Sequence, residues 1–330
     1  MKTKKEYLVL AILIIALSLY LVFRKADRGH YRLPNLPQIP ASEMTRVEIS
    51  KPDGKILLEK KEDRWRISPQ GYPVDPFKMK SILDTIGTLT LTTLISESKS
   101  YERYDLQKLK RIGVKAWSGD ELKREFDVGK IAPSFSHTFV KIAGDERVYQ
   151  AQQNFRDRFD QTVENLRDKA ALRFEPEEIQ KLDITRGKDS LRLTRKFLPV
   201  EVTTSQGGET QDKEPHRMEP MWQTPEGKGV DESKLKRLLS TLSRLNCSSY
   251  IEGRKKGDFT DPVYTIELEG AKAYSLSIFE KAKKEDKTRP AFSSDNAFPF
   301  LLPDFQANRI MISPEELLKK PDESSSGSEG

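Results

Sequence analysis

The chain has 330 residues, enough for two ordinary domains, and a formal charge of +6. Residues 1–32 contain seven Lys and Arg residues against two acidic ones, so the rest of the chain is close to neutral. A near-neutral body argues against a nucleic-acid partner. The single cysteine, Cys247, excludes an internal disulfide, and we interpret it as a small buried core residue.

Residues 7–23 form an uninterrupted apolar run that follows the short basic segment 1–6. At a rise of about 1.5 Å per residue, a helix of this length spans roughly 26 Å, enough for a thin membrane. Neither a small-residue cleavage pattern nor a lipobox cysteine follows the run. We therefore expect an uncleaved, single-pass signal anchor in the cytoplasmic (inner) membrane. Basic residues flank both ends of the run. A short basic N-terminus nevertheless favours a topology with residues 1–6 in the cytoplasm and the body on the periplasmic, extracytoplasmic side.

Residues 24–43 contain Pro34, Pro37 and Pro40 at three-residue spacing. This spacing favours polyproline II, so we expect a stiff juxtamembrane linker that holds the body away from the membrane. A ligand for a proline-reading domain is the alternative.

One pattern occurs twice in the rest of the chain. The hairpin-like stretches Arg46–Lys61 and Lys181–Lys196 each lead to a tryptophan, Trp65 or Trp222, and then to the phrase Pro-x-Gly-x-x-Val-Asp. An apolar helical pattern follows both copies of the phrase. This recurrence predicts an internal duplication. We expect a first α+β module at 44–172, a second at 173–312 with a mobile loop inserted at 197–221, and a short helix with a disordered tail at 313–330.

The phrase ends in Asp75 and Asp231, each placed directly before a helical pattern. We interpret both as N-caps, whose oxygens accept bonds from free helix amides. A carboxylate pair is the alternative for these two residues. We interpret the tryptophans as core residues, with stacking on a sugar as the alternative. Lysine and arginine residues on the helices are interpreted as solvated outer faces: Lys78, Lys80, Lys234, Lys236 and Arg237.

The sequence contains little that indicates catalysis. His30, His137 and His216 have neither a second histidine nor a cysteine at ligand spacing. The Gly-x-Ser-x-Gly, Gly-x-x-x-x-Gly-Lys-Ser/Thr and Gly-x-Gly-x-x-Gly motifs are absent. The stretch Asp127–Lys130 is better interpreted as a strand end than as an anion site. We therefore assign no catalytic, cofactor-binding or metal residue and expect neither a cofactor nor enzymatic activity.

The combination of a basic signal anchor, hairpins, Pro-x-Gly-x-x-Val-Asp and an apolar helix resembles the bacterial family known as domain of unknown function 4340. Three phrases add to the resemblance: Tyr104-Asp105-Leu106, Val128-Gly129-Lys130 and Arg167-Asp168-Lys169. The resemblance covers roughly residues 44–312. It implies a membrane-anchored envelope protein, in some members linked with gliding-motility-type ABC transport systems. It carries no catalytic residues.

These observations favour an α+β fold with an N-terminal transmembrane helix and two duplicated modules. In each module, an antiparallel sheet packs on one main helix. We expect a membrane-anchored interaction or scaffold protein with an envelope protein partner, such as an accessory subunit of an ABC transport system. Two alternatives are open. One is an envelope hydrolase with a site in an inter-module cleft, and the other is a binder of an anionic envelope polymer.

Overall fold

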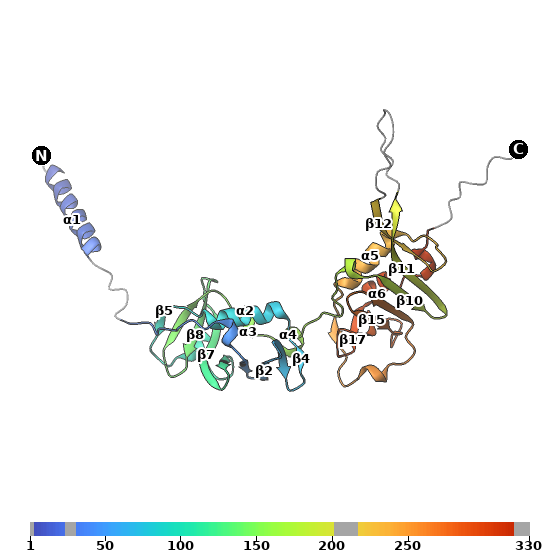
Figure 1. Cartoon of the computed structure of the whole chain (residues 1–330). Coiled ribbons are helices and arrows are strands. Elements are labelled where there is room, and N and C mark those ends of the chain that lie inside the picture. Colours follow the sequence, from blue (N-terminus) through green and yellow to red (C-terminus); the bar gives the residue numbers. More distant parts are fainter. Residues whose placement is uncertain (1–2, 24–30, 201–216, 320–330) are drawn as a thin grey trace, which may run out of the picture. The chain divides into compact units, whose positions relative to one another are not determined.

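The computed structural model describes residues 3–23, 31–200 and 217–319. Its contacts divide the chain into two units, Met1–Asp168 and Lys169–Gly330 (Figure 1). We call residues 31–168 the first module and residues 169–319 the second module. Residues 169–172, expected above in the first module, fall in the second unit because the amides of Ala171 and Leu172 bond to the carbonyl of Leu245.

Helix α1 (Thr3–Phe23) contains the apolar run, and its described apolar side chains, such as Ile12 and Leu17, are exposed. Within the part of the chain that the structure describes, no helix combines the length and the apolar character that a membrane crossing requires. The anchor expected over residues 7–23 is therefore without support from the structure and stays a prediction.

The proline-containing segment differs from the expected stand-off. Residues 24–30 lie outside the described residues, but from residue 31 onward the segment packs on the first module. Leu33, Leu36 and Ile39 contact its core, and the Ile39 amide donates to the Gly87 carbonyl at 3.1 Å. The spacing explains the difference, because a polyproline II chain has three residues per turn and places these apolar residues on one face.

The first module is built on a nine-stranded antiparallel sheet with the strand order β4-β3-β2-β1-β6-β7-β8-β9-β5. Alternating residues of its strands face a core that helix α2 (Pro76–Gly87) covers. Its strands are β1 (Arg46–Lys51), β2 (Gly54–Lys61), β3 (Arg64–Ser68), β4 (Tyr72–Pro73), β5 (Leu91–Ser96), β6 (Ile112–Ser118), β7 (Glu121–Ile131), β8 (His137–Ile142) and β9 (Val148–Gln152).

The second module repeats this topology with the order β12-β11-β10-β14-β15-β16-β17-β13. Helix α5 (Glu232–Ser243) takes the place of α2, and the single bridge between Gln223 and Gly229 takes the place of β4. The strands are β10 (Lys181–Arg186), β11 (Asp189–Val200), β12 (Arg217–Gln223), β13 (Ser249–Tyr250), β14 (Tyr264–Glu269), β15 (Ala273–Ile278), β16 (Thr288–Ser293) and β17 (Phe300–Pro303). The matching strand orders support an internal duplication.

Both modules end in the same closing contact. The amide of Asp75 donates to the carbonyl of Leu166, and the amide of Asp231 donates to that of Leu317, both at 2.8 Å. In the first module, the segment that ends at Leu166 forms the one-turn helices α3 (Arg156–Phe159) and α4 (Val163–Leu166). In the second, the segment that ends at Leu317 forms α6 (Asp304–Ile310) and the 3-10 turn η5 (Pro314–Leu317). Ser313 precedes η5 without a side-chain cap bond, although its sequence is typical of a capping box.

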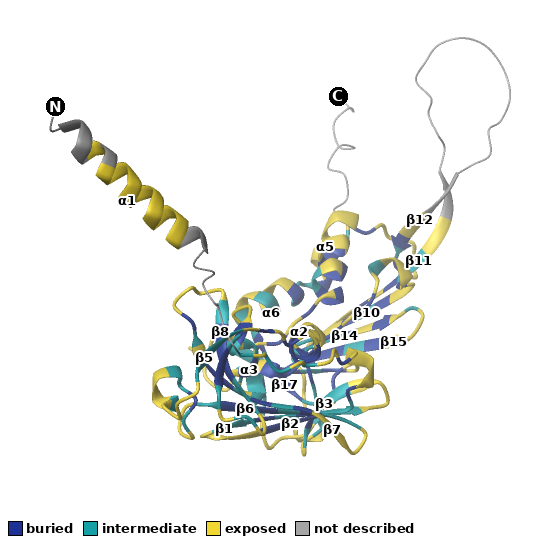
Figure 2. Cartoon of the chain, turned by 90° about the vertical axis from the view of Figure 1, so that its left-hand side faces the viewer, coloured by how far each residue is buried: buried dark blue, intermediate teal, exposed yellow. Residues whose placement is uncertain are grey.

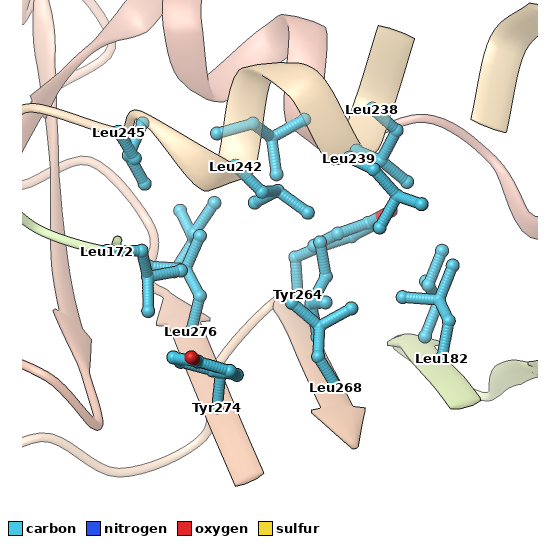
Figure 3. Packing of buried hydrophobic residues seen from close by; sticks show 14 of the residues in the cluster. Leu172, Leu182, Leu238, Leu239, Leu242, Leu245, Tyr264, Leu268, Tyr274 and Leu276 are labelled. Carbon is cyan, nitrogen blue, oxygen red and sulfur yellow. The ribbon is translucent and has the colours of Figure 1, made fainter. Parts of the chain in front are cut away.

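Burial is concentrated between each helix and its sheet (Figure 2). In the second module, leucines of α5 point toward sheet residues that include Tyr264, Leu268 and Leu276 (Figure 3). Trp222 belongs to this core and is 8% exposed, whereas Trp65 is half-buried beside the core of the first module. The core interpretation therefore holds fully for Trp222 and in part for Trp65.

The insertion between β11 and β12 is shorter than the expected loop of residues 197–221. Strand β11 continues to Val200 and β12 begins at Arg217, and the two pair from Val200↔Arg217 to Thr194↔Gln223. The β11–β12 hairpin therefore continues past Thr194, the residue that pairs with Lys181 at the start of β10. Residues 201–216, the polar centre of the expected loop, lie outside the described residues.

Candidate functional site

A groove of about 800 Å³ runs between helices α5 and α6 of the second module. Helix α5 begins at the N-cap Asp231 and buries its leucine face on the sheet, so its opposite face points to solvent. Helix α6 lies beside that face and contributes Arg309. We call this hollow the α5–α6 groove, and its lining is Ser233, Lys234, Lys236, Arg237, Leu238, Ser240, Thr241, Arg309 and Ile312.

The charge of the groove has one sign. Its lining contains four cationic side chains and no carboxylate. Lys234 is committed to the fold, because its ammonium donates to the Glu316 carbonyl at 2.8 Å and lies 3.5 Å from Asp231. Within the described residues, Lys236 and Arg237 have no side-chain hydrogen bond or ion pair, and Arg309 lies over the ring of Phe305 at 5.8 Å. Among the described residues, none of these three cations makes an ion pair, although Glu232 lies one helical turn before Lys236.

The first module provides an internal reference for this groove. Aligning the N-caps and closing contacts places Lys80, Asp84 and Arg158 at the positions of Lys236, Ser240 and Arg309. There, Lys80 pairs with Asp84 at 2.5 Å. Arg158 donates to Thr85 Oγ1 at 2.6 Å and to Gln153 Oε1 at 3.1 Å. In the first module, Lys80 therefore has a carboxylate partner and Arg158 has two neutral hydrogen-bond partners. No side-chain hydrogen bond or ion pair of Lys236, Arg237 or Arg309 is present among the described residues of the second module.

Another difference between the modules increases the charge further. Ser81 of the first module corresponds to Arg237 of the second, so the second module gains a cation where it also loses the carboxylate of Asp84. In contrast, Lys78 donates to the Asn165 carbonyl as Lys234 does to the Glu316 carbonyl. The shared contact belongs to the fold, and the unshared cations are the candidates for binding.

A second hollow, of about 420 Å³, lies on the outer sheet face of the first module around Gly113. Its charges are largely paired. Arg111 contacts Asp127 at 2.7 Å, and Lys115 contacts Glu125 at 3.0 Å. Paired charges have less to offer a ligand, so we consider the α5–α6 groove the stronger candidate.

The structure confirms that Asp75 and Asp231 are N-caps. An Asp75 Oδ1 accepts from the amides of Phe77 and Lys78 at 2.9 and 3.0 Å, and Asp231 accepts from the amide of Lys234 at 3.1 Å. The bond from that amide lowers the pKa of Asp231 below its usual range. Both carboxylates therefore cap the first turn of a helix, and their role is structural.

The remaining candidates from the sequence are dispersed. His137 lies at the start of β8, with Nδ1 3.1 Å from Ser136 Oγ and 3.2 Å from Ser134 Oγ. His30 and His216 lie outside the described residues. In the described ranges, no three His, Cys, Asp or Glu side chains gather as metal ligands would. Cys247 is buried, as expected from the sequence for a small core residue.

The groove was missed because lysine-rich helix faces usually have no function beyond solvation. Arg309 lies on a helix that the sequence did not indicate, about seventy residues beyond α5. A signal was nevertheless present in the duplication. Placing the two helical patterns one above the other shows Asp84 replaced by Ser240 and Ser81 by Arg237.

The three phrases that add to the family resemblance, at Tyr104–Leu106, Val128–Lys130 and Arg167–Lys169, prove to be structural. A Cβ atom on Gly129 of β7 would overlap the carbonyl oxygen of Tyr104, so two of the phrases meet at this glycine. The third meets Pro-x-Gly-x-x-Val-Asp, because the guanidinium of Arg167 stacks on Tyr72 at 3.5 Å and the Asp168 amide donates to the Pro73 carbonyl at 2.8 Å. These motifs therefore specify the fold.

Comparison with known proteins agrees with this interpretation. Residues 65–265 match the family described as Domain of unknown function (DUF4340). No curated protein matches the chain, and no solved structure does. Since the matched residues make up more than half of the sequence, the chain belongs to the DUF4340 family.

Proposed function

We propose that this protein is a membrane-anchored interaction protein of the bacterial envelope, whose second module holds a ligand or partner in the α5–α6 groove. The observation that supports this proposal most strongly is the set of three cations, Lys236, Arg237 and Arg309, that make no ion pair among the described residues. Side chains of this kind recognise anionic groups when they converge on one hollow.

The anchor is part of the same proposal. The run at residues 7–23 is apolar throughout, it lies within helix α1, and the described apolar side chains of α1 are exposed. Exposed apolar side chains on one helix favour an apolar surrounding. Basic residues flank the run, and we place the two modules on the extracytoplasmic side.

Binding is favoured over hydrolysis by the composition of the groove. Its lining supplies cations and hydroxyl groups, but neither the histidine nor the carboxylate with which most hydrolases move protons. Hydrolysis is therefore the weaker candidate for this groove. An accessory role in an ABC transport system is a specific form of the interaction role, and the same experiment addresses it.

The test is photo-crosslinking in intact cells from a photoreactive residue placed at Ser240, with Asp84 as the matched position in the first module. Both positions are exposed on the outer face of equivalent helices. We expect capture from position 240 and much less from position 84. Recovery of transporter permease or auxiliary subunits would identify the accessory role. Equal capture from both positions, or capture from neither, would refute the proposal that the groove is the binding surface.

A further inference from the structure

We infer that the α5–α6 groove binds a non-protein polyanion, a chain that bears repeated phosphate or carboxylate groups. This inference rests on the proposed function, because it assigns a ligand class to the same groove. It is carried by the contrast between two equivalent sites on one chain, of which only the second leaves Lys236, Arg237 and Arg309 without a side-chain hydrogen bond or ion pair among the described residues.

The first step concerns the position of Ser240. It lies four residues after Lys236 on α5, the spacing at which a carboxylate pairs with a lysine on the same helix. Asp84 makes that pair with Lys80 in the first module, at 2.5 Å. With serine at this position, no carboxylate follows Lys236 at this spacing. The ammonium of Lys236 and the neighbouring guanidinium groups can therefore bind an anion from outside the fold. An anionic ligand supplies this charge.

The second step concerns the donors. Arg237 and Arg309 each offer a planar fork that matches the paired oxygens of phosphate or carboxylate. The hydroxyl groups of Ser233 and Ser240 lie in the same lining and are exposed donors. A neutral or cationic ligand would leave the three charges unneutralised, so the donor set favours an oxyanion.

The third step concerns size. A volume of about 800 Å³ is within the range of pockets that hold drug-sized ligands and far exceeds what a single phosphate needs. Cations from two helices line the groove, so one anionic group does not satisfy them all. The groove therefore suits several anionic groups joined in a chain.

The fourth step separates a polymer from a folded protein partner. Stable protein interfaces depend on buried aromatic anchors, above all tryptophan and tyrosine. The lining of the groove contains no aromatic residue, and its two apolar residues are Leu238, which faces the core, and Ile312. Polar and charged contacts dominate, which favours a flexible polyanion.

The experiment measures binding to the full-length chain in nanodiscs of zwitterionic lipid. Linear tripolyphosphate and a short oligogalacturonate are the phosphate and carboxylate probes. Orthophosphate, which has a single phosphate group, is the control. We expect one or both multivalent probes to bind, with an affinity that falls as salt is raised. Ser240→Asp restores the carboxylate of the first module next to Lys236 and should weaken binding by about tenfold or more.

The matched control is Asp84→Ser, which leaves the groove of the second module intact and should not weaken binding. The double variant Ser81→Arg, Asp84→Ser gives α2 the two residues of α5 and should add only weaker binding at the first module, because Arg158 stays bonded to Thr85 and Gln153. Asp84 and Ser240 are exposed and Ser81 is half-buried, so circular dichroism should show an unchanged fold.

The outcomes separate the two proposals. Equal affinity of the wild type and the Ser240→Asp variant would overturn the assignment of the polyanion to this groove. Orthophosphate binding as tightly as tripolyphosphate would overturn the multivalent ligand. If no probe binds while crosslinking from position 240 captures a protein, the inferred ligand class is wrong and the proposed function stands. If both experiments fail, both proposals fall.

Discussion

Arg124 of β7 fastens the N-terminal segment to the first module, and its removal should release that segment. The side chain is only 6% exposed. Its guanidinium donates to the carbonyls of Ile86 and Gly87 at the end of helix α2 and to the carbonyl of Pro37. A cation at a helix C-terminus also interacts favourably with the helix dipole. Arg124 therefore joins the sheet, the helix end and the chain that leads to α1.

The cost of Arg124→Ala follows from these contacts. Each hydrogen bond from a charged donor contributes about 1.5–3 kcal/mol. Burial works against this gain, because it disfavours the charged form and lowers the pKa of Arg124. Allowing for that desolvation, we expect a net loss of about 3 kcal/mol at this attachment, which corresponds to roughly a hundredfold change in a local opening equilibrium.

Hydrogen exchange of the Ile39 amide is the appropriate assay, because this amide donates to the Gly87 carbonyl at 3.1 Å. In Arg124→Ala, its exchange should accelerate by about a hundredfold, while the second module is unchanged. Arg111→Ala is the control. That arginine is more exposed and has one carboxylate partner, Asp127, so its loss should cost under about 1 kcal/mol. Unchanged exchange at Ile39 in Arg124→Ala would refute the fastening role.

Three further predictions concern the stability of the modules. Tyr264→Phe removes a buried hydroxyl that donates to a backbone carbonyl at 3.0 Å and should lower the free energy of unfolding of the second module by about 1–2 kcal/mol in a denaturant titration. The Arg147 side chain holds the pKa of Asp145 far below its usual range, so this carboxylate stabilises the fold above the unfolded pKa of about 3.9 and loses that contribution as the pH falls toward the folded pKa. The difference in unfolding free energy between the wild type and Asp145→Asn should therefore narrow from pH 7 to pH 3, and a constant difference would contradict the assignment. Gly129→Ala should destabilise the first module by about 2 kcal/mol or more because its Cβ would overlap a carbonyl oxygen, whereas Gly113→Ala, with its nearest neighbour at 3.6 Å, should cost much less on the same thermal unfolding measurement.

Much of the fold could be predicted because its local signals are strong. The aspartates before each helix are N-caps in the structure, and the alternation around Val47 and Ile49 gives strand β1 with both residues buried. Such patterns depend on neighbours in the sequence. The prediction of matching modules also followed from sequence alone, because the same short-range signals recur in the same order.

Other features depend on contacts between distant residues. The phrases Pro133-x-Phe135-Ser136 and Pro290-x-Phe292-Ser293 share their letters and suggest that the duplication extends to the ends of both modules. Phe135 nevertheless lies in a turn before β8, and Phe292 lies within β16. The strand registers pair Ser277 with Phe292 and Asp127 with Lys141. Ser277 and Asp127 occupy equivalent positions of β15 and β7, so Phe292 corresponds to Lys141. A local similarity of letters therefore does not mark equivalent positions, which the register of distant strands assigns.

A difference between the duplicated modules indicates a ligand only where it leaves a charged or polar group without a partner. The registers place Tyr274 at the position of Arg124, and Tyr274 stacks on Phe174 at 5.1 Å, so the second module attaches its own leading segment by packing where the first uses hydrogen bonds. That substitution exchanges one satisfied arrangement for another and needs no ligand. The change from Asp84 to Ser240 is different, because it removes the carboxylate that follows a lysine by one helical turn, and Lys236 makes no ion pair among the described residues although Glu232 lies one turn before it. A fold loses electrostatic stability by keeping such a groove. The loss is balanced when a polyanion occupies the groove, so added multivalent anions should raise the free energy of unfolding of the second module.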